Sequence, residues 1–155
     1  DPGGPVIGCM ASSKAYADEF PQAFRQRRSY EFSFSGVKTA VAQRVAAMGA
    51  PNEEQIYAIA RGFQRSVVEI LVRKVVFAAR SKQVERVVLA GGVAANSGLR
   101  SHAAKVCGEN DLELFAPPRK RCTDNASMIA YAGALSLEAG KSSPFDISPR
   151  ANWPL

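Results

Sequence analysis

The stretch that decides the fold spans residues 87–96 and reads VVLAGGVAAN. Its first four residues are apolar, as in a buried strand, and they end in Gly91 and Gly92, with Asn96 placed to start a helix. Glycines after a strand tolerate positive φ and carry no Cβ atom that would keep a ligand from the backbone. Many α/β folds hold a nucleotide at such a turn. A tight strand-to-helix turn with an N-cap fits equally well, so both interpretations stay open. The spacing is not G-x-G-x-x-G and does not indicate a dinucleotide fold.

Strands and helices alternate on both sides of this turn, which predicts the α/β class. We expect strands at 30–34, 84–90 and 112–116, and helices at 37–48, 53–82 and 97–107. The strand at 84–90 suits a sheet covered on both faces. A Pro/Gly turn at 2–5 leads into a short helix, and Thr123 or Asp124 starts a last helix that ends near Gly140. Asn52 is a good N-cap for the long helix, whose predicted core face comprises Ile56, Ile59, Ala60, Phe63, Val67, Ile70 and Leu71.

Length and composition indicate one globular domain. The chain has 155 residues, of which 46% are hydrophobic and 22% charged, as in ordinary globular proteins. Its longest apolar region, 67–79, is interrupted by Glu69, Arg73 and Lys74, so no membrane helix is expected. The three cysteines form no C-x-x-C pair, which favours a reducing cytoplasm over a disulfide framework. The chain opens on a turn with neither an initiator Met nor a signal peptide, which suggests a fragment of something longer.

The net charge of +6 favours polyanionic partners. Basic residues gather at 25–28 and again at 119–121, and such clusters raise encounter rates with nucleic acid. The alternative is an ordinary solvated surface, and charge alone does not decide between them.

Further candidate sites are weak when each is taken alone. Asp124, just after the basic loop, could cap a helix or bind a metal, but one carboxylate cannot hold an ion. The segment 32–39, FSFSGVKT, could meet a phosphate or contribute to the core. Backbone amides around Gly3 and Gly4 could face a ligand. His102 is interpreted as an exposed helix histidine, because no second histidine is present.

The combination of these segments resembles the C-terminal half of the TsaD family of tRNA threonylcarbamoyltransferases, formerly called O-sialoglycoprotein endopeptidases. The matching pieces are PGGP at 2–5, FSFSGVKT at 32–39, Phe63 with Gln64, LAGGVAAN at 89–96, and PP at 117–118 followed by CTDNASMIAY at 122–131. They occur in the order of the family and cover nearly the whole chain.

The resemblance implies a fold and an activity. The fold is an actin/Hsp70/hexokinase-like (ribonuclease H-like) lobe, a mixed sheet flanked by helices, over residues 1–140, followed by a C-terminal tail at 141–155. The activity is that of an acyltransferase, which moves the threonylcarbamoyl group from threonylcarbamoyl-AMP to N6 of adenosine at position 37 of ANN-reading tRNAs. AMP leaves, and no residue is singled out as a general base. The implied partners are tRNA and bacterial accessory subunits, a TsaB-like paralogue and a TsaE-like ATPase.

Site residues follow from the same resemblance. Gly4 and Asn96 match positions that bind the adenylate, with Gly91 and Gly92 as a backbone cradle. Asp124 matches a ligand of one divalent metal, iron or zinc. The family's H-x-x-x-H metal ligands and its N-terminal lobe are absent from this chain, so the fragment alone is expected to be inactive.

Two other classes of protein compete with the transferase. One is an ATP-binding lobe of the sugar-kinase or Hsp70 type, which a Gly-Gly turn fits equally well. The other is a non-catalytic scaffold paralogue of the same fold, against which the retention of Asp124 argues. The older glycoprotease interpretation has no nucleophile triad and no H-E-x-x-H motif to support it.

Overall fold

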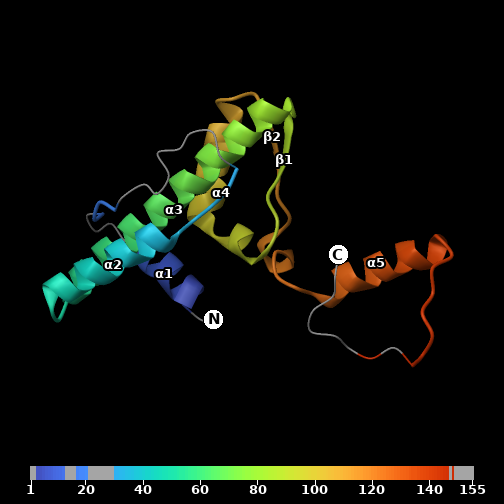
Figure 1. Cartoon of the computed structure of the whole chain (residues 1–155), viewed down its shortest axis with the longest axis horizontal. Coiled ribbons are helices and arrows are strands. Elements are labelled where there is room, and N and C mark those ends of the chain that lie inside the picture. The colour runs from blue at the N-terminus through green and yellow to red at the C-terminus, as the bar shows by residue number, and fades with distance from the viewer. Residues whose placement is uncertain (1–2, 13–16, 21–29, 147, 149–155) are drawn as a thin grey trace. The chain divides into compact units, whose positions relative to one another are not determined.

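The computed structural model describes residues 3–12, 17–20, 30–146 and 148. They belong to two compact units, residues 1–122 and 123–155 (Figure 1). The first unit contains the helices α1 (Gly3–Ala11), α2 (Ser35–Met48), α3 (Glu53–Lys82) and α4 (Ser97–Gly108), the strands β1 (Arg86–Val88) and β2 (Glu113–Phe115), and the short 3-10 helices η1 (Gly92–Ala95) and η2 (Arg119–Arg121). The second contains α5 (Ala126–Glu138). The fold is α/β, with helices and a small parallel sheet.

The long helix α3 begins and ends as its sequence predicts. Asn52 and Gln55 form a reciprocal capping box, in which each side chain accepts a hydrogen bond of 2.9 Å from the other residue's backbone N–H. Glu53 and Glu54 stand in the first turn, where the helix dipole favours negative charge. None of the helices in the described part of the chain is long and apolar enough to cross a membrane.

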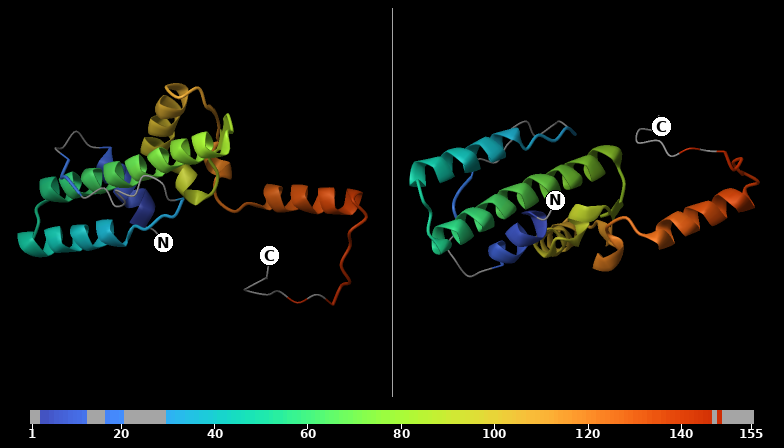
Figure 2. Two further views of the ribbon diagram at one scale, coloured as in Figure 1. Left: turned by 45° about the horizontal axis from the view of Figure 1, so that its top comes forward. Right: turned by 90° about the horizontal axis from the view of Figure 1, so that it is seen from below.

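The core of the first unit forms where α4 packs on α3. α2 and α4 lie on opposite sides of α3 (Figure 2), and α1 also packs against α3. Val68 and Val72 of α3 meet Leu99 and Ala103 of α4. Partly buried residues of these two helices and of the sheet region pack against this cluster: Leu71, Val106, Leu89 and Leu114. Of the predicted core face, Ile59, Ala60 and Ile70 are buried, which confirms the prediction for these three residues. Ile56 is 38% exposed, so the prediction was wrong for Ile56.

The segment 17–20 crosses α3 at close range. The backbone N–H of Asp18 donates to the carbonyl of Ala58 at 3.0 Å, and both side-chain oxygens of Asp18 accept from Arg44 of α2, at 3.0 and 3.3 Å. Gly62 makes the approach possible, because a Cβ atom there would lie 2.1 Å from the carbonyl oxygen of Asp18. The segment is therefore held between α2 and α3.

The sheet is smaller and more exposed than the sequence predicts. β1 and β2 pair in parallel, with Val87 opposite Leu114, and each has only three residues. Val88 is 72% exposed and Phe115 is 45% exposed. The prediction of a strand covered on both faces was therefore wrong for the described residues.

Two predictions near the N-terminus also differ from the structure. Residues 30–34 form no strand. Phe32 stacks on Phe34 with ring centroids 6.3 Å apart, and Tyr30 contacts Phe77 of α3. The alternation of aromatic residues serves ring contacts rather than strand pairing. Gly3 and Gly4 begin α1 instead of forming a turn. The basic residues at 25–28 lie outside the described residues.

The second unit is described by α5, and Asn125 is its N-cap. The Asn125 side chain accepts from the backbone N–H of Met128 at 3.2 Å, so neither Thr123 nor Asp124 starts the helix as predicted. None of its residues is buried. Ile129 and Tyr131 are 70% and 68% exposed, so the apolar side chains of α5 are largely in contact with solvent.

Candidate functional site

The glycine turn joins β1 to α4 through one positive-φ residue and a short 3-10 helix. Gly91 has a φ of 84°, in the region that favours glycine over other residues. The backbone N–H of Ala94 then donates to the Gly91 carbonyl at 2.9 Å, and that of Asn96 to the Val93 carbonyl at 3.0 Å. A Cβ atom at Gly91 would meet nothing within 4 Å, so the backbone there stands in open space.

Asn96 makes two side-chain hydrogen bonds. Its Oδ1 accepts from the backbone N–H of Leu99 at 2.9 Å, which caps α4 as predicted. Its Nδ2 donates to Oε1 of Gln64 on α3 at 2.8 Å. An asparagine amide has two donor hydrogens and two acceptor lone pairs. Capping therefore leaves donor and acceptor capacity for a ligand, and the two interpretations of Asn96 are compatible.

Gly4 and Asn96 line the same pocket. Its volume is about 150 Å³, and it lies among α1, α3 and the glycine turn. The wall is mostly apolar and also includes Ile7, Gly8, Phe63, Gln64, Val67, Val68, Leu71, Val93 and Leu99. The structure thus brings together Gly4 and Asn96, two sequence-predicted site residues that are far apart in the sequence. Gly91 and Gly92 directly precede the lining residue Val93 in the sequence, but they do not line the pocket themselves.

Sequence reasoning missed part of this wall. Phe63, Val67 and Leu71 were predicted as core. All three are partly buried and line the pocket, and Leu71 also packs against the core cluster. Gln64 had no predicted role, although a polar side chain one helical turn from the apolar residues Ala60, Val67 and Val68 was a usable signal. Its hydrogen-bond partner, Asn96, is 32 residues away, and only the tertiary structure shows the pair.

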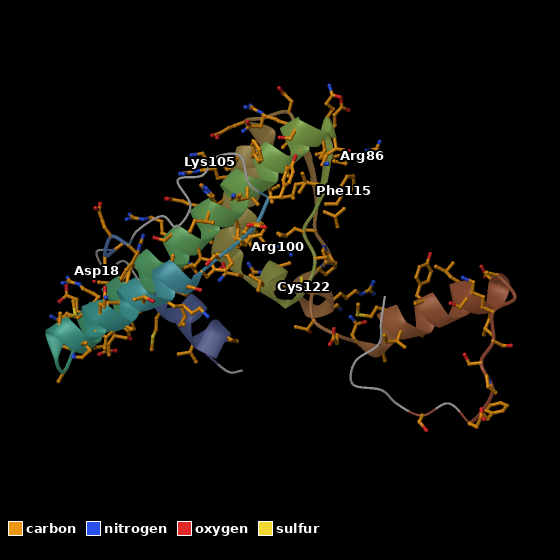
Figure 3. All side chains as sticks on the ribbon, viewed as in Figure 1. Asp18, Arg86, Arg100, Lys105, Phe115 and Cys122 are labelled. Carbon is orange, nitrogen blue, oxygen red and sulfur yellow. The ribbon has the colours of Figure 1, made fainter. Side chains whose placement is uncertain are left out.

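Arg100 and Cys122 connect the glycine turn to the basic segment 119–121, which forms η2. Arg100 Nη1 donates to the Ala94 carbonyl at 3.0 Å and lies 3.7 Å from the sulfur of Cys122 (Figure 3). Cys122 is 5% exposed. The preceding residues of η2, Arg119, Lys120 and Arg121, are exposed. The buried Cys122 therefore directly follows three basic side chains that are exposed to solvent.

Asp124 lies in the second unit, and it is exposed. Its neighbour Asn125 holds the helix start, so the capping interpretation of Asp124 is wrong. No group of three or more His, Cys, Asp or Glu side chains able to hold a metal occurs among the described residues. Asp124 therefore offers one carboxylate, and the described part of the chain does not complete a metal site.

The segment 32–39 does not line this pocket. It starts α2, with Phe34 as the N-cap residue, and the Lys38 backbone N–H donates to the Phe34 carbonyl at 3.0 Å. Val37 is fully buried.

His102 is partly buried in α4 rather than exposed, so the prediction of an exposed histidine was wrong. In the same helix, burial raises the pKa of the Cys107 thiol, and that cysteine is 1% exposed.

The geometry first defines a class of protein. The chain is an α/β protein with a pocket beside the turn that joins a strand to a helix. The helix-capping asparagine lines this pocket. The pocket is largely apolar with a few polar groups, which is typical of small-molecule sites. A profile of the family described as "tRNA N6-adenosine threonylcarbamoyltransferase" (TsaD) matches residues 1–131. The chain belongs to this family.

Curated relatives agree with the family assignment. A protein of Sorangium cellulosum named tRNA N6-adenosine threonylcarbamoyltransferase is 46% identical over 99% of this chain. Proteins with the same name from Staphylococcus carnosus and Anaplasma marginale are 40% identical over 95% and 39% identical over 99% of it. The chain spans less than half the length of these relatives, 44%, 43% and 47% respectively.

Proposed function

We propose that the full-length protein is an acyltransferase that makes threonylcarbamoyladenosine in tRNA, in the cytoplasm. The donor is threonylcarbamoyl-AMP, and the acceptor is N6 of adenosine at position 37 in ANN-reading tRNAs. The observation that carries this proposal is that Gly4 and Asn96 line one pocket in a chain whose relatives bear the name of this transferase. The sugar-kinase, Hsp70-like and scaffold alternatives are not favoured, because these relatives are named as transferases.

The residues of this chain bind and orient the adenylate. Asn96 offers its remaining hydrogen-bonding capacity to a ribose hydroxyl or a base edge, and the side chains of Phe63 and Val93 exclude water. The open backbone at Gly91 allows close approach of the ligand. Orienting the donor so that N6 of the adenosine attacks the carbonyl carbon, with AMP leaving, lowers the barrier through positioning. We assign no general base.

The residues that line the pocket form one side of a larger binding site. Its volume of about 150 Å³ is below the roughly 300–1,000 Å³ of typical small-molecule sites. We propose that the chain is one lobe of an actin/Hsp70/hexokinase-like fold, with residues 1–140 as the lobe and 141–155 as its tail. The N-terminal lobe would supply the opposite wall. On this proposal, the 155-residue chain alone is inactive.

Asp124 is proposed as one ligand of an iron or zinc ion. A bound ion of this kind would polarise a carbonyl group, but the donor set in the described residues is incomplete, so we assign no step to it. In the full-length protein, Asp124→Ala should lower metal content and transfer, whereas Asp146→Ala in the same unit should change neither. Unchanged metal content in Asp124→Ala would contradict this assignment.

The proposed macromolecular partners are tRNA and two accessory subunits, a TsaB-like paralogue and a TsaE-like ATPase. The exposed cations of η2 support the tRNA contact, because Lys and Arg side chains that neutralise phosphates supply most non-specific affinity for nucleic acid. This contact should weaken as salt concentration rises.

Transfer to tRNA by the full-length protein tests the proposed function. Serine is as good an N-cap as asparagine, so Asn96→Ser keeps the cap of α4 and removes the amide. We expect kcat/KM for the donor to fall about 3- to 30-fold, which corresponds to the loss of one or two hydrogen bonds. No transfer of the threonylcarbamoyl group to tRNA by the wild-type full-length protein, or ATP-dependent phosphorylation instead, would refute the proposal.

A further inference from the structure

The Gln64 side chain joins α3 to the start of α4. Gln64 Oε1 accepts from Asn96 Nδ2 at 2.8 Å, and both side chains are partly buried. Asn96 Oδ1 is held at the same time by the backbone N–H of Leu99. Each end of the Asn96 amide therefore has its own partner, and these two bonds determine which way the amide faces.

Two glycines enclose this pair of side chains. A Cβ atom at Gly98 would lie 2.8 Å from Gln64 Nε2 and 3.3 Å from Asn96 Oδ1. On the other side, a Cβ atom at Gly8 of α1 would lie 3.6 Å from Asn96 Nδ2 and 3.9 Å from Gln64 Oε1. The absence of a side chain at Gly98 leaves the space in which the Gln64 amide lies.

We propose that Gln64 is a positioning residue for the adenylate, and that it acts through Asn96. This inference rests on the proposed function, in which Asn96 contacts the ribose or base. With Gln64 in place, one N–H of Asn96 is committed to Oε1, and the rest of the amide faces the pocket in a fixed orientation. Without it, the amide of Asn96 keeps only its cap bond, and its donor is left without this partner beside an apolar wall. Preorganised polar groups bind a ligand at a lower entropic cost.

Substitutions at Gln64 separate positioning from direct contact. Gln64→Leu removes the acceptor, whereas Gln64→Glu keeps an oxygen that can accept from Asn96 Nδ2. Adenosine is the probe because it carries no charge, so the added carboxylate does not repel it. In the full-length protein we expect Gln64→Leu to weaken adenosine binding about 5- to 30-fold, and Gln64→Glu to stay within about threefold of wild type.

Two further measurements distinguish positioning from a merely structural role. In the transfer assay, Gln64→Leu should raise KM for the donor and leave kcat within about twofold. In an Asn96→Ser background, Gln64→Leu should cause no further loss of adenosine affinity, because residues that act together are not additive.

Gly98→Ala provides an independent disturbance of the same pair. It removes no hydrogen-bonding group, but its methyl group displaces the flexible end of Gln64, so adenosine binding should weaken by about threefold or more. Gly108→Ala in the same helix is the matched control, because a Cβ atom there meets nothing within 4 Å. It should bind adenosine like wild type, and circular dichroism should show all variants folded.

The results distinguish failure of this inference from failure of the proposed function. If Asn96→Ser weakens adenosine binding but Gln64→Leu does not, Gln64 has no positioning role. If Gln64→Leu and Gln64→Glu weaken it equally, Gln64 does not act through its acceptor oxygen, and the proposal is overturned. If Asn96→Ser itself binds adenosine like wild type, the proposed adenylate site fails, and the role of Gln64 fails with it.

Discussion

Replacing Gly62 by alanine tests how the segment 17–20 packs across α3. A Cβ atom at this position would lie 2.1 Å from the carbonyl oxygen of Asp18, 2.8 Å from its carbonyl carbon and 3.1 Å from its backbone nitrogen. All three are backbone atoms, so no side-chain rotation relieves the contact. Ordinary contact begins at 3.4 Å, so the two backbones must separate by about 1.3 Å, the difference between 3.4 and 2.1 Å.

This separation has a calculable cost. Overpacking of a well-packed region costs about 1–3 kcal/mol. The hydrogen bond from Asp18 to the carbonyl of Ala58 is 3.0 Å long and would be stretched or lost, at a further 0.5–1.5 kcal/mol, roughly. We therefore expect Gly62→Ala to lower the free energy of unfolding by about 1.5–4.5 kcal/mol. Urea denaturation of the chain, followed by far-ultraviolet circular dichroism, measures this change.

Gly108→Ala is the control for the intrinsic effect of the substitution. It also exchanges glycine for alanine in a helix, but in open space, where alanine is neutral or stabilises by up to about 1 kcal/mol. Equal unfolding free energies for Gly62→Ala and Gly108→Ala would refute the packing of residues 17–20 on α3.

Two further predictions concern a cap and the thiols. Asn52→Ala removes the capping box of α3 and should cost about 1 kcal/mol in urea denaturation; Asn52→Ser should cost far less, and equal losses would contradict the role of the cap. Cys107 should react with iodoacetamide much more slowly than the exposed Cys9, because Cys107 is buried and its pKa is raised from 9.0 by burial. Because the raised pKa means that the folded state holds the Cys107 thiol proton more tightly than the unfolded state does, this thiol's contribution to the free energy of unfolding is fully present below pH 9.0. That contribution declines as the pH rises above 9.0. Equal labelling rates of the two thiols, measured by mass spectrometry, would contradict their placement.

Local signals predicted the helices and the glycine turn well. Asn52 followed by two glutamates fixes the start of α3 because capping and the helix dipole act within one turn. Gly91 adopts the positive φ expected after a strand. Asn96 caps α4 as expected, because its side chain satisfies a backbone N–H three residues away. These features depend on neighbouring residues, which the sequence displays directly.

Features that depend on distant partners were predicted less well. The alternation at residues 30–34 is compatible with a strand, but a strand needs a partner, and Phe32 and Phe34 instead stack on each other. Thr123, Asp124 and Asn125 are all good cap residues, and only the backbone conformation selects Asn125. The contact between Gln64 and Asn96 joins two helices, so no local pattern could reveal it.

The position of a bound adenylate tests the central claim most directly. In a crystal structure of the full-length protein with AMP, we predict a hydrogen bond between the Asn96 side chain and the ribose or base. The ligand should also contact the wall formed by Phe63 and Val93, near Gly4. An adenylate bound with no contact to Asn96, or on another face of the protein, would contradict the account.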